Sequence, residues 1–186
     1  MQIRSVEPTD LSALIEIDGT IDSGSYLHVE RSGEGMAIAW KIEERPLRTK
    51  VSDRNRPTDD SQFLLKQIVT GAEEGRALLA EHDGAMIGLI VAQAQPAFGT
   101  MRLIDLRIDF DYRRQGLASG MVYQLISEAR EQELRAVSAE TRANNFPANQ
   151  LFQKLGFDLT GLDTHRHSNH DLVKESATMF WYAALK

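Results

Sequence analysis

The spacing of apolar residues changes along this chain, and these changes predict most of its elements. Short apolar runs bounded by turn residues predict strands, whereas apolar positions three and four residues apart predict helices. Asp83-Gly84 stands between two apolar runs and is a strong signal for a β-hairpin turn. From residue 75 onward, the expected strands cover 76–82, 85–95, 101–109, 136–142, 157–163 and 177–185, and the expected helices cover 115–132 and 147–155.

The first part of the chain carries a weaker pattern. A strand is expected over 2–6, and apolar residues between 11 and 17 predict a helix capped by Thr9 or Asp10. Residues 19–35 are rich in Gly, Ser and polar residues, which predicts a loop.

The next segment changes character twice. It begins as a strand at 37–42 and then becomes charged, with Pro46 expected to break the strand. Residues 52–60 predict a linker, after which Asp60 or Ser61 is expected to cap a helix. The predicted apolar face of that helix is formed by Phe63, Leu64, Ile68 and Val69.

The order of these elements predicts the fold class. An antiparallel meander is followed by a strand-helix-strand crossover, and then by a helix and closing strands. This order is typical of a mixed α/β (α+β) domain. Because the sequence contains no repeat, low-complexity tract or second domain boundary, we expect a single domain over residues 1–186.

Composition narrows the possible functions. The chain has 186 residues and no cysteine, which excludes disulfides and thiolate catalysis and removes the usual zinc ligands. Its 27 acidic residues outnumber 21 basic ones, which argues against a general nucleic-acid binder and is compatible with a cationic partner. Because the sequence shows no signal-peptide core and no long apolar run, we expect a cytoplasmic protein that does not enter a membrane.

A basic turn stands where the strand over 101–109 meets the helix over 115–132. Residues 113–118 read Arg-Arg-Gln-Gly-Leu-Ala. The N-terminus of a helix offers unpaired N–H groups and the positive end of the helix dipole, which favour a phosphate or pyrophosphate. An ordinary strand-to-helix turn that needs one glycine explains the same residues equally well.

Two motifs resemble those of the GNAT N-acyltransferases. Arg113-x-x-Gly116-x-Ala118 resembles the pyrophosphate-binding motif of that family, between an apolar strand and an amphipathic helix. The segment 145–157, with the pattern N-x-x-A-x-x-L-F-x-K-x-G-F, resembles the second family signature. Residues 105–108, 140–148 and 179–182 are similar to the streptothricin acetyltransferase group within this superfamily.

The resemblance implies a domain plan and a donor site. It implies an acetyl-CoA-binding core over 75–163 with two splayed parallel strands, a variable acceptor-side part over 1–74, and a loop and closing strand over 164–186. Acetyl-CoA would be the acyl donor, with its pantetheine on the backbone of the first splayed strand and its pyrophosphate on the turn. The residues implied in donor binding are Leu106, Ile108, Arg113, Arg114, Gln115, Gly116, Leu117, Ala118, Ser119, Asn145 and Lys154.

The residues for proton transfer depart from the family pattern. Ile104 occupies the position of the frequent Glu base, and Phe152 occupies that of the frequent Tyr acid. Asp105 and Glu140, on the two strands expected to splay, are the alternative catalytic carboxylates. Strand alternation is expected to turn Asp105 away from the face shared by Ile104 and Leu106, which would also suit a structural pairing with an arginine.

Other side chains have competing explanations. His165, His167 and His170 lie near Asp163 and Asp171, but in a polar loop without cysteine we expect exposed or hydrogen-bonded histidines and no metal. This loop is expected to border the acceptor site. Aromatic residues in the last strand and in the first part of the chain suit either a pocket or the core: Trp181, Tyr182 and Trp40.

The sequence therefore predicts an acetyl-CoA-dependent N-acetyltransferase. It would move an acetyl group directly to a primary amine of a small cationic molecule in a ternary complex. A protein or peptide amine as acceptor, and a non-catalytic acyl-CoA-binding module, are the alternatives. The exact acceptor, the acyl-chain preference and the role of residues 19–60 are open, as is a homodimer.

Overall fold

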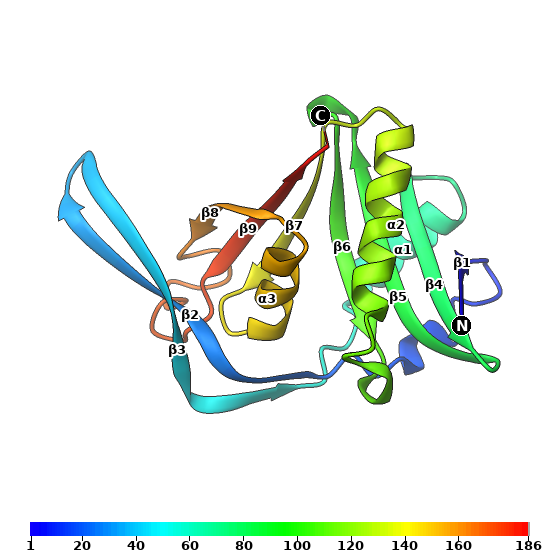
Figure 1. Cartoon of the computed structure of the whole chain (residues 1–186), viewed down its shortest axis with the longest axis horizontal. Coiled ribbons are helices and arrows are strands. Elements are labelled where there is room, and N and C mark those ends of the chain that lie inside the picture. The colour runs from blue at the N-terminus through cyan, green and yellow to red at the C-terminus, as the bar shows by residue number, and fades with distance from the viewer. Residues whose placement is uncertain (186) are drawn as a thin grey trace. The chain divides into compact units, whose positions relative to one another are not determined.

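A computed structural model describes residues 1–185 of the chain. Its α-helices and strands follow the predicted order from residue 75 onward (Figure 1). The strands are β1 (Gln2–Ser5), β2 (Ile21–Glu34), β3 (Ala37–Asp53), β4 (Gly75–His82), β5 (Ala85–Gln95), β6 (Thr100–Ile108), β7 (Ala136–Arg142), β8 (Asp158–Asp163) and β9 (Thr178–Ala184). The α-helices are α1 (Asp59–Val69), α2 (Leu117–Glu131) and α3 (Phe146–Lys154).

The strands form one large sheet and one two-stranded ribbon. The seven-stranded sheet has the order β1-β4-β5-β6-β7-β9-β8, and the ribbon pairs β2 with β3. Neighbours from β1 to β6 are antiparallel, whereas β6 and β7 are parallel. This confirms the predicted mixed, mostly antiparallel sheet of an α+β fold with a central parallel pair.

Two compact units divide the described chain. The first contains Met1–Thr20, Arg54–Ala139 and the residues from Tyr182 onward. The second contains Ile21–Asp53 and Glu140–Trp181. The β2–β3 ribbon therefore belongs to the second unit, together with α3 and β8.

Helices cover both faces of the sheet in the first unit. In Figure 1, α2 lies in front of β4, β5 and β6, and α1 lies behind them. Leu79 in β4 is fully buried in the apolar cluster that includes Leu65 and Ile68 of α1. On the α2 face, Gly88 of β5 packs so closely that a Cβ atom at this position would lie 3.1 Å from Met121 Sδ. Because both faces are covered, these strands have the continuous apolar runs that made them predictable.

The loop predicted over 19–35 is wrong. Residues 21–34 form β2, which pairs antiparallel with β3 in a long ribbon. The break expected at Pro46 is also wrong, because β3 continues to Asp53. Pro46 pairs with Ser25 directly beside a register shift in β2, a place where a ladder tolerates a residue without an N–H group.

The helix predicted over 11–17 is reduced to a short 3₁₀ turn, Leu14–Glu16. Asp10 is buried, and its carboxylate accepts hydrogen bonds from the Glu7 N–H group and from the Arg4 guanidinium. The side chain predicted to cap a helix is therefore committed to the preceding segment and to β1. The predicted strand over 2–6 is confirmed as β1.

The helix predicted after residue 60 is confirmed as α1, but its cap is different. Thr58 is the N-cap, and its hydroxyl accepts from the Ser61 N–H group at 3.2 Å. Phe63, expected on the buried face, is 64% exposed. Among the described residues, no helix is long and apolar enough to cross a membrane.

Candidate active site

The free edge of β6 is the starting point of the site. Parallel pairing between β6 and β7 runs from Thr100–Ala136 to Leu103–Ala139 and stops there. The rest of β6, from Ile104 to Ile108, keeps its antiparallel partner β5 on the other side. One edge of this half-strand is therefore left without a strand partner among the described residues.

Backbone polar groups point into that free edge. The Asp109 N–H group donates to the Ile87 carbonyl at 2.9 Å, and the register pairs Ile108 with Gly88 and Leu106 with Ile90. In an antiparallel ladder, residues alternate between those that bond to the partner strand and those that point away from it. Leu106 and Ile108 are therefore the residues whose backbone groups face away from β5, as a pantetheine-binding edge requires.

The turn after β6 leads directly into α2. Arg114 and Gly116 adopt left-handed backbone conformations, with φ of 60° and 84°. The first hydrogen bond within α2 joins the Gly120 N–H group to the Gly116 carbonyl at 3.0 Å. Among the described residues, none accepts a hydrogen bond from the backbone N–H groups of residues 114–119. These groups and the helix dipole together form a concentrated set of donors for an anion.

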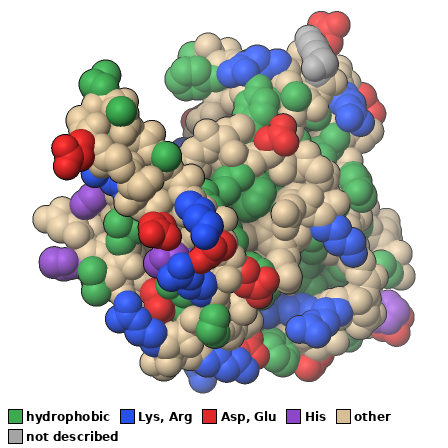
Figure 2. Space-filling model, turned by 60° about the vertical axis from the view of Figure 1, so that its left-hand side comes forward, with side chains coloured by type: hydrophobic (Ala, Val, Ile, Leu, Met, Phe, Trp, Pro, Cys, Tyr) green, Lys and Arg blue, Asp and Glu red, His purple; other side chains and the backbone are tan. Residues whose placement is uncertain are grey.

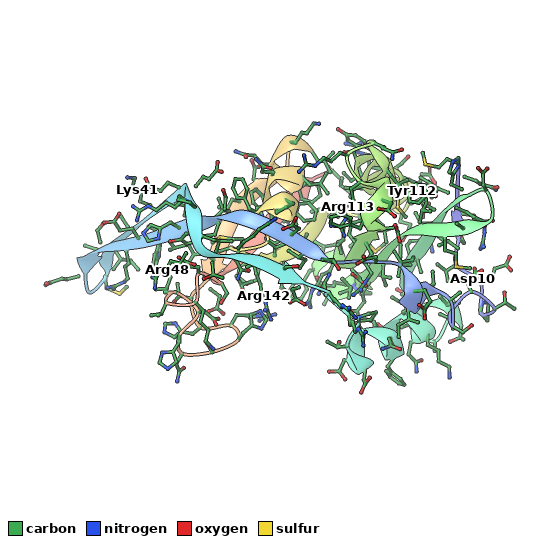
Figure 3. The ribbon with its side chains drawn as sticks, turned by 90° about the horizontal axis from the view of Figure 1, so that it is seen from below. Asp10, Lys41, Arg48, Tyr112, Arg113 and Arg142 are labelled. Atoms are coloured by element: carbon green, nitrogen blue, oxygen red, sulfur yellow. The ribbon has the colours of Figure 1, made fainter. Side chains whose placement is uncertain are left out.

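The Arg113 side chain is turned into the protein. Its guanidinium donates to three backbone carbonyls, those of Ile108, Asp18 and Thr20. It also lies over the Phe110 ring, 5.1 Å from the centroid. Figure 3 shows Arg113 beside Tyr112 in the turn. Arg114, in contrast, is exposed.

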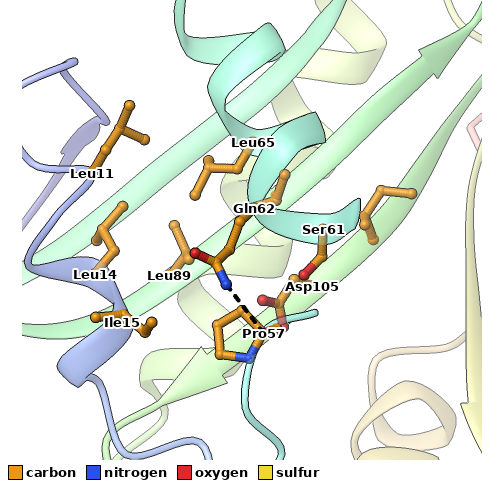
Figure 4. A pocket seen from close by; sticks show the side chains of 11 residues that line it. Leu11, Leu14, Ile15, Pro57, Ser61, Gln62, Leu65, Leu89 and Asp105 are labelled. Carbon is orange, nitrogen blue, oxygen red and sulfur yellow. Dashed lines mark hydrogen bonds between the residues drawn. The ribbon is translucent and has the colours of Figure 1, made fainter. Parts of the chain in front are cut away.

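A bulge in β6 changes the direction of its side chains. The register passes from Ala92–Leu103 to Val91–Asp105, so Ile104 is the extra residue. A bulge interrupts the alternation of faces along a strand. The prediction that Asp105 turns away from Ile104 is therefore wrong, because both side chains line the same pocket (Figure 4).

This pocket is mostly apolar and lies within the first unit. It has a volume of about 400 Å³, counting the part open to solvent. Its polar side chains are Ser61, Gln62 and Asp105, and the Gln62 amide donates to the Pro57 carbonyl at 3.2 Å. The apolar lining comes from Leu11, Leu14, Ile15, Leu65, Leu89, Val91 and Ile104.

Burial gives Asp105 unusual acid-base properties. Its carboxylate accepts from Arg107 Nε at 2.6 Å, and both side chains are largely shielded from solvent. Burial raises the pKa of the Asp105 carboxyl above its ordinary value, while the Arg107 guanidinium and the Leu106 N–H group oppose this shift. An Asp with a raised pKa in a pocket is a better proton acceptor for an amine than an exposed one. The pairing of Asp105 with an arginine was one of the sequence-based expectations, and the partner is Arg107.

The remaining predicted residues lie in the second unit. Glu140 accepts from the Arg166 guanidinium at 3.0 Å. Asn145 is the N-cap of α3, where its side chain accepts from the Ala148 N–H group at 3.4 Å. Lys154 is exposed in the last turn of α3. These contacts give Glu140 and Asn145 local structural partners.

Sequence reasoning missed Asn149, which is buried in the second unit. Its carbonyl oxygen accepts from Thr141 and from the Trp181 indole N–H group, at 2.5 and 3.0 Å. Its amide donates to the backbone carbonyls of Arg142 and Asn145. Trp181 is thereby fixed in the core beside Phe152, which is also buried. An asparagine inside a helix with an apolar face was the available signal.

The loop that carries the three histidines contains local hydrogen bonds. The His165 ring contacts the Thr164 hydroxyl at 2.8 Å. The backbone N–H group of His167 donates to the Asp171 carboxylate at 2.9 Å. Within residues 1–185, no group of three His, Cys, Asp or Glu side chains converges in a way that could hold a metal ion. On the face shown in Figure 2, basic and acidic side chains are interspersed.

A family model agrees with this arrangement. The model described as "Acetyltransferase (GNAT) family" matches residues 36–157, which include β6, the basic turn and α2. The chain belongs to the GNAT acetyltransferase family. This confirms the resemblance that the two motifs predicted.

Curated relatives within this GNAT family include antibiotic-modifying and protein-modifying enzymes. Streptothricin acetyltransferase of Escherichia coli is 29% identical over 75 residues, covering 40% of this chain and 43% of that protein. Streptothricin acetyltransferase A of Bacillus subtilis is 30% identical over 111 residues, covering 59% and 63%. A ribosomal-protein alanine N-acetyltransferase of Escherichia coli is 36% identical over 76 residues, covering 41% and 50%. The chain thus spans less than two thirds of each of these relatives.

Solved structures show the same fold along almost the whole chain. Nourseothricin acetyltransferase has a TM-score of 0.78 at 20% identity, covering 100% of this chain and 98% of that one. A Bacillus anthracis protein assigned as a streptothricin acetyltransferase, solved with acetyl coenzyme A, has a TM-score of 0.74 at 21% identity, with 98% of each chain covered. These similarities confirm the fold of a single GNAT domain.

Proposed function

We propose that this protein transfers an acetyl group from acetyl-CoA to a primary amine of a small molecule. The free edge of β6, followed by the left-handed turn and the N-terminus of α2, is the observation that carries this proposal. In this proposal, Leu106 and Ile108 bind the pantetheine arm and residues 114–119 bind the pyrophosphate. Acetyl-CoA is a substrate, and no metal takes part.

Asp105 is the general base in this proposal. An alkyl ammonium has a pKa near 10.4, so an acceptor amine must lose a proton before it attacks. Asp105 has a raised pKa, lines a pocket and stands on the half of β6 whose edge is free. Glu140 is the weaker candidate: both carboxylates bind an arginine, but Asp105 lines the pocket and Glu140 is not among the pocket's lining residues.

The reaction needs no covalent enzyme intermediate. Asp105 takes a proton from the ammonium group, and the amine nitrogen attacks the thioester carbonyl carbon. Backbone N–H groups at the β6 edge stabilise the oxygen that becomes negative. The C–S bond then breaks, the nitrogen of the new amide releases its second proton to solvent, and CoA leaves as a thiolate that takes a proton from solvent. Buried Phe152 cannot supply this proton.

A small-molecule acceptor is favoured over a peptide by the relatives. Three similar proteins bear the names of enzymes that acetylate streptothricin or nourseothricin, and one of these similarities extends over the full chain. The apolar pocket beside Asp105 suits the aliphatic part of an amine-bearing arm. A ribosomal-protein acetyltransferase among the relatives makes a peptide with an N-terminal alanine the comparison acceptor.

Release of free thiol from acetyl-CoA tests this proposal. We expect turnover with streptothricin or a related amine, and much slower turnover with the alanine peptide. Asp105→Asn keeps the size of the side chain but removes the base, so kcat should fall about 100-fold. Glu140→Gln, the matched change at the other candidate carboxylate, should alter kcat by less than about threefold.

Three results would contradict parts of this proposal. Binding of acetyl-CoA without thiol release for any amine would identify a non-catalytic acyl-CoA-binding module. A large loss in Glu140→Gln with little change in Asp105→Asn would move the base to Glu140. Faster turnover of the peptide than of every small amine would mean that the acceptor is a peptide and not a small molecule.

A further inference from the structure

The two adjacent arginines of the basic turn have different surroundings. Arg113 is half-buried, and its guanidinium donates to the carbonyls of Ile108 at 3.0 Å and Asp18 at 3.1 Å, and to that of Thr20. Arg114 is exposed and makes no hydrogen bond or ion pair with the described residues. From the family motif alone, both arginines would be expected to supply positive charge near a phosphate.

The bonds of Arg113 join two distant parts of the chain. Its Nε bonds to the last residue of β6, while its two terminal nitrogens bond to the segment 18–20. Asp109 adds a second link, since its carboxylate accepts from the Asp18 N–H group at 3.3 Å. The turn between β6 and α2 is therefore held from the side by a segment about 90 positions earlier in the chain.

The same bonds orient the free edge of β6. The Ile108 carbonyl points away from β5 and would otherwise be an unpaired acceptor at that edge. Because Arg113 Nε occupies it, the Ile108 peptide and the start of the turn are fixed together. Carbonyls are neutral, so these three hydrogen bonds depend on the fork geometry of the guanidinium. The Asp18 carboxylate adds an electrostatic attraction to Arg113.

We propose that Arg113 is a positioning residue, which locks the β6 edge and the turn onto residues 18–20, while Arg114 supplies the positive charge that faces the donor's phosphates. This inference rests on the proposed function, because it assigns roles within the acetyl-CoA site. Loss of Arg113 disturbs the pantetheine edge and the phosphate cradle together. Loss of Arg114 weakens only the attraction for phosphate.

A comparison of two donors separates these roles. Acetyl-CoA carries the phosphates, whereas S-acetyl-pantetheine has the same thioester arm without phosphates. We expect Arg113→Ala to lower kcat/KM about 10-fold or more with both donors. The matched variant Arg114→Ala should lower kcat/KM with acetyl-CoA severalfold and leave it unchanged with S-acetyl-pantetheine.

Arg113→Lys keeps the charge but loses the fork, and it serves where Arg113→Ala does not fold. Positioning predicts that it is impaired with both donors. If kcat/KM of the Arg113 variants fell with acetyl-CoA but not with S-acetyl-pantetheine, the proposal would be overturned, because Arg113 would then contact a phosphate. A lower melting temperature with unchanged kcat/KM in the folded fraction would also overturn it, since the contacts would then serve stability alone.

Failure of the proposed function has its own signature. It would appear as wild-type protein that releases no thiol with any acceptor. The same comparison is then made by calorimetry with CoA and pantetheine. A CoA-specific loss of affinity in Arg113→Ala, or no binding by the wild type, would contradict the assignment.

Discussion

The β4–β5–β6 part of the sheet and the β2–β3 ribbon are both antiparallel, yet different forces hold them. The sheet is covered by α1 on one face and α2 on the other, and most residues of its strands are apolar. The ribbon is much more exposed, and at its far end Ile38 and Trp40 are 44% and 38% exposed. Side-chain ion pairs such as Lys41–Glu43 line its other face.

This difference indicates which part of the molecule can support a rigid site. A two-stranded ribbon is at best marginally stable in water by itself. A sheet of three or more strands that packs against helices can be stable independently. The candidate donor site is built on the sheet that is packed on both faces. Leu106 and Ile108 belong to β6, and the turn is backed by buried Leu117 and Met121 of α2.

The largest effect is expected from matched isoleucine truncations in the two regions. Ile90 in β5 is 1% exposed, and Ile90→Ala should lower the free energy of unfolding by about 2–5 kcal/mol because it leaves a cavity. Ile38→Ala in the ribbon should cost less than about 1 kcal/mol. Urea unfolding of both variants measures this, and equal losses would mean that the ribbon belongs to the cooperative core.

A smaller effect, dependent on pH, is expected at Asp171 in the second unit. Backbone N–H groups and the Ser168 hydroxyl hold the pKa of its buried carboxyl below the ordinary value. A depressed pKa contributes stability above the unfolded value of 3.8, and this contribution is lost as the pH falls through the folded value. An asparagine at position 171 has only one acceptor oxygen, so it cannot accept from both the His167 N–H group and the Ser168 hydroxyl. Asp171→Asn should therefore lower the free energy of unfolding by about 1–3 kcal/mol at neutral pH.

Melting temperatures measured from pH 7 down to pH 3 check this sign. The gap between wild type and Asp171→Asn should stay constant at neutral pH and narrow below about pH 3.8. A gap that widens in acid would reverse the assignment of the shift.

The same contrast explains what the sequence could predict. Strands 76–82, 85–95 and 101–109 were found because burial on both faces leaves a strong apolar signal. The strand predicted at 37–42 is confirmed as the start of β3. The rest of the ribbon was missed because its exposed positions are free to be Ser, Gly or charged, which is also the composition of a loop. Motifs located the turn at 113–118 because its chemistry depends on local backbone geometry.

Side-chain partners were much harder to predict. The bulge at Ile104 that brings Asp105 into the pocket leaves no mark in a single sequence. The three carbonyls that hold Arg113 come from two segments far apart in the chain, and the network around Asn149 joins α3 to Thr141 and Trp181. Long-range hydrogen bonds of this kind follow from the tertiary fold and not from local pattern.

One comparison tests most directly whether the turn before α2 binds the donor. Gln115→Glu adds one negative charge at the exposed turn without changing side-chain size, and Gln132→Glu adds the same charge at the opposite end of α2, about 20 Å away. Calorimetric titration with acetyl-CoA should show about 5–10-fold weaker binding for Gln115→Glu and wild-type affinity for Gln132→Glu. Equal affinity in all three proteins would contradict the assignment of residues 114–119 as the phosphate site.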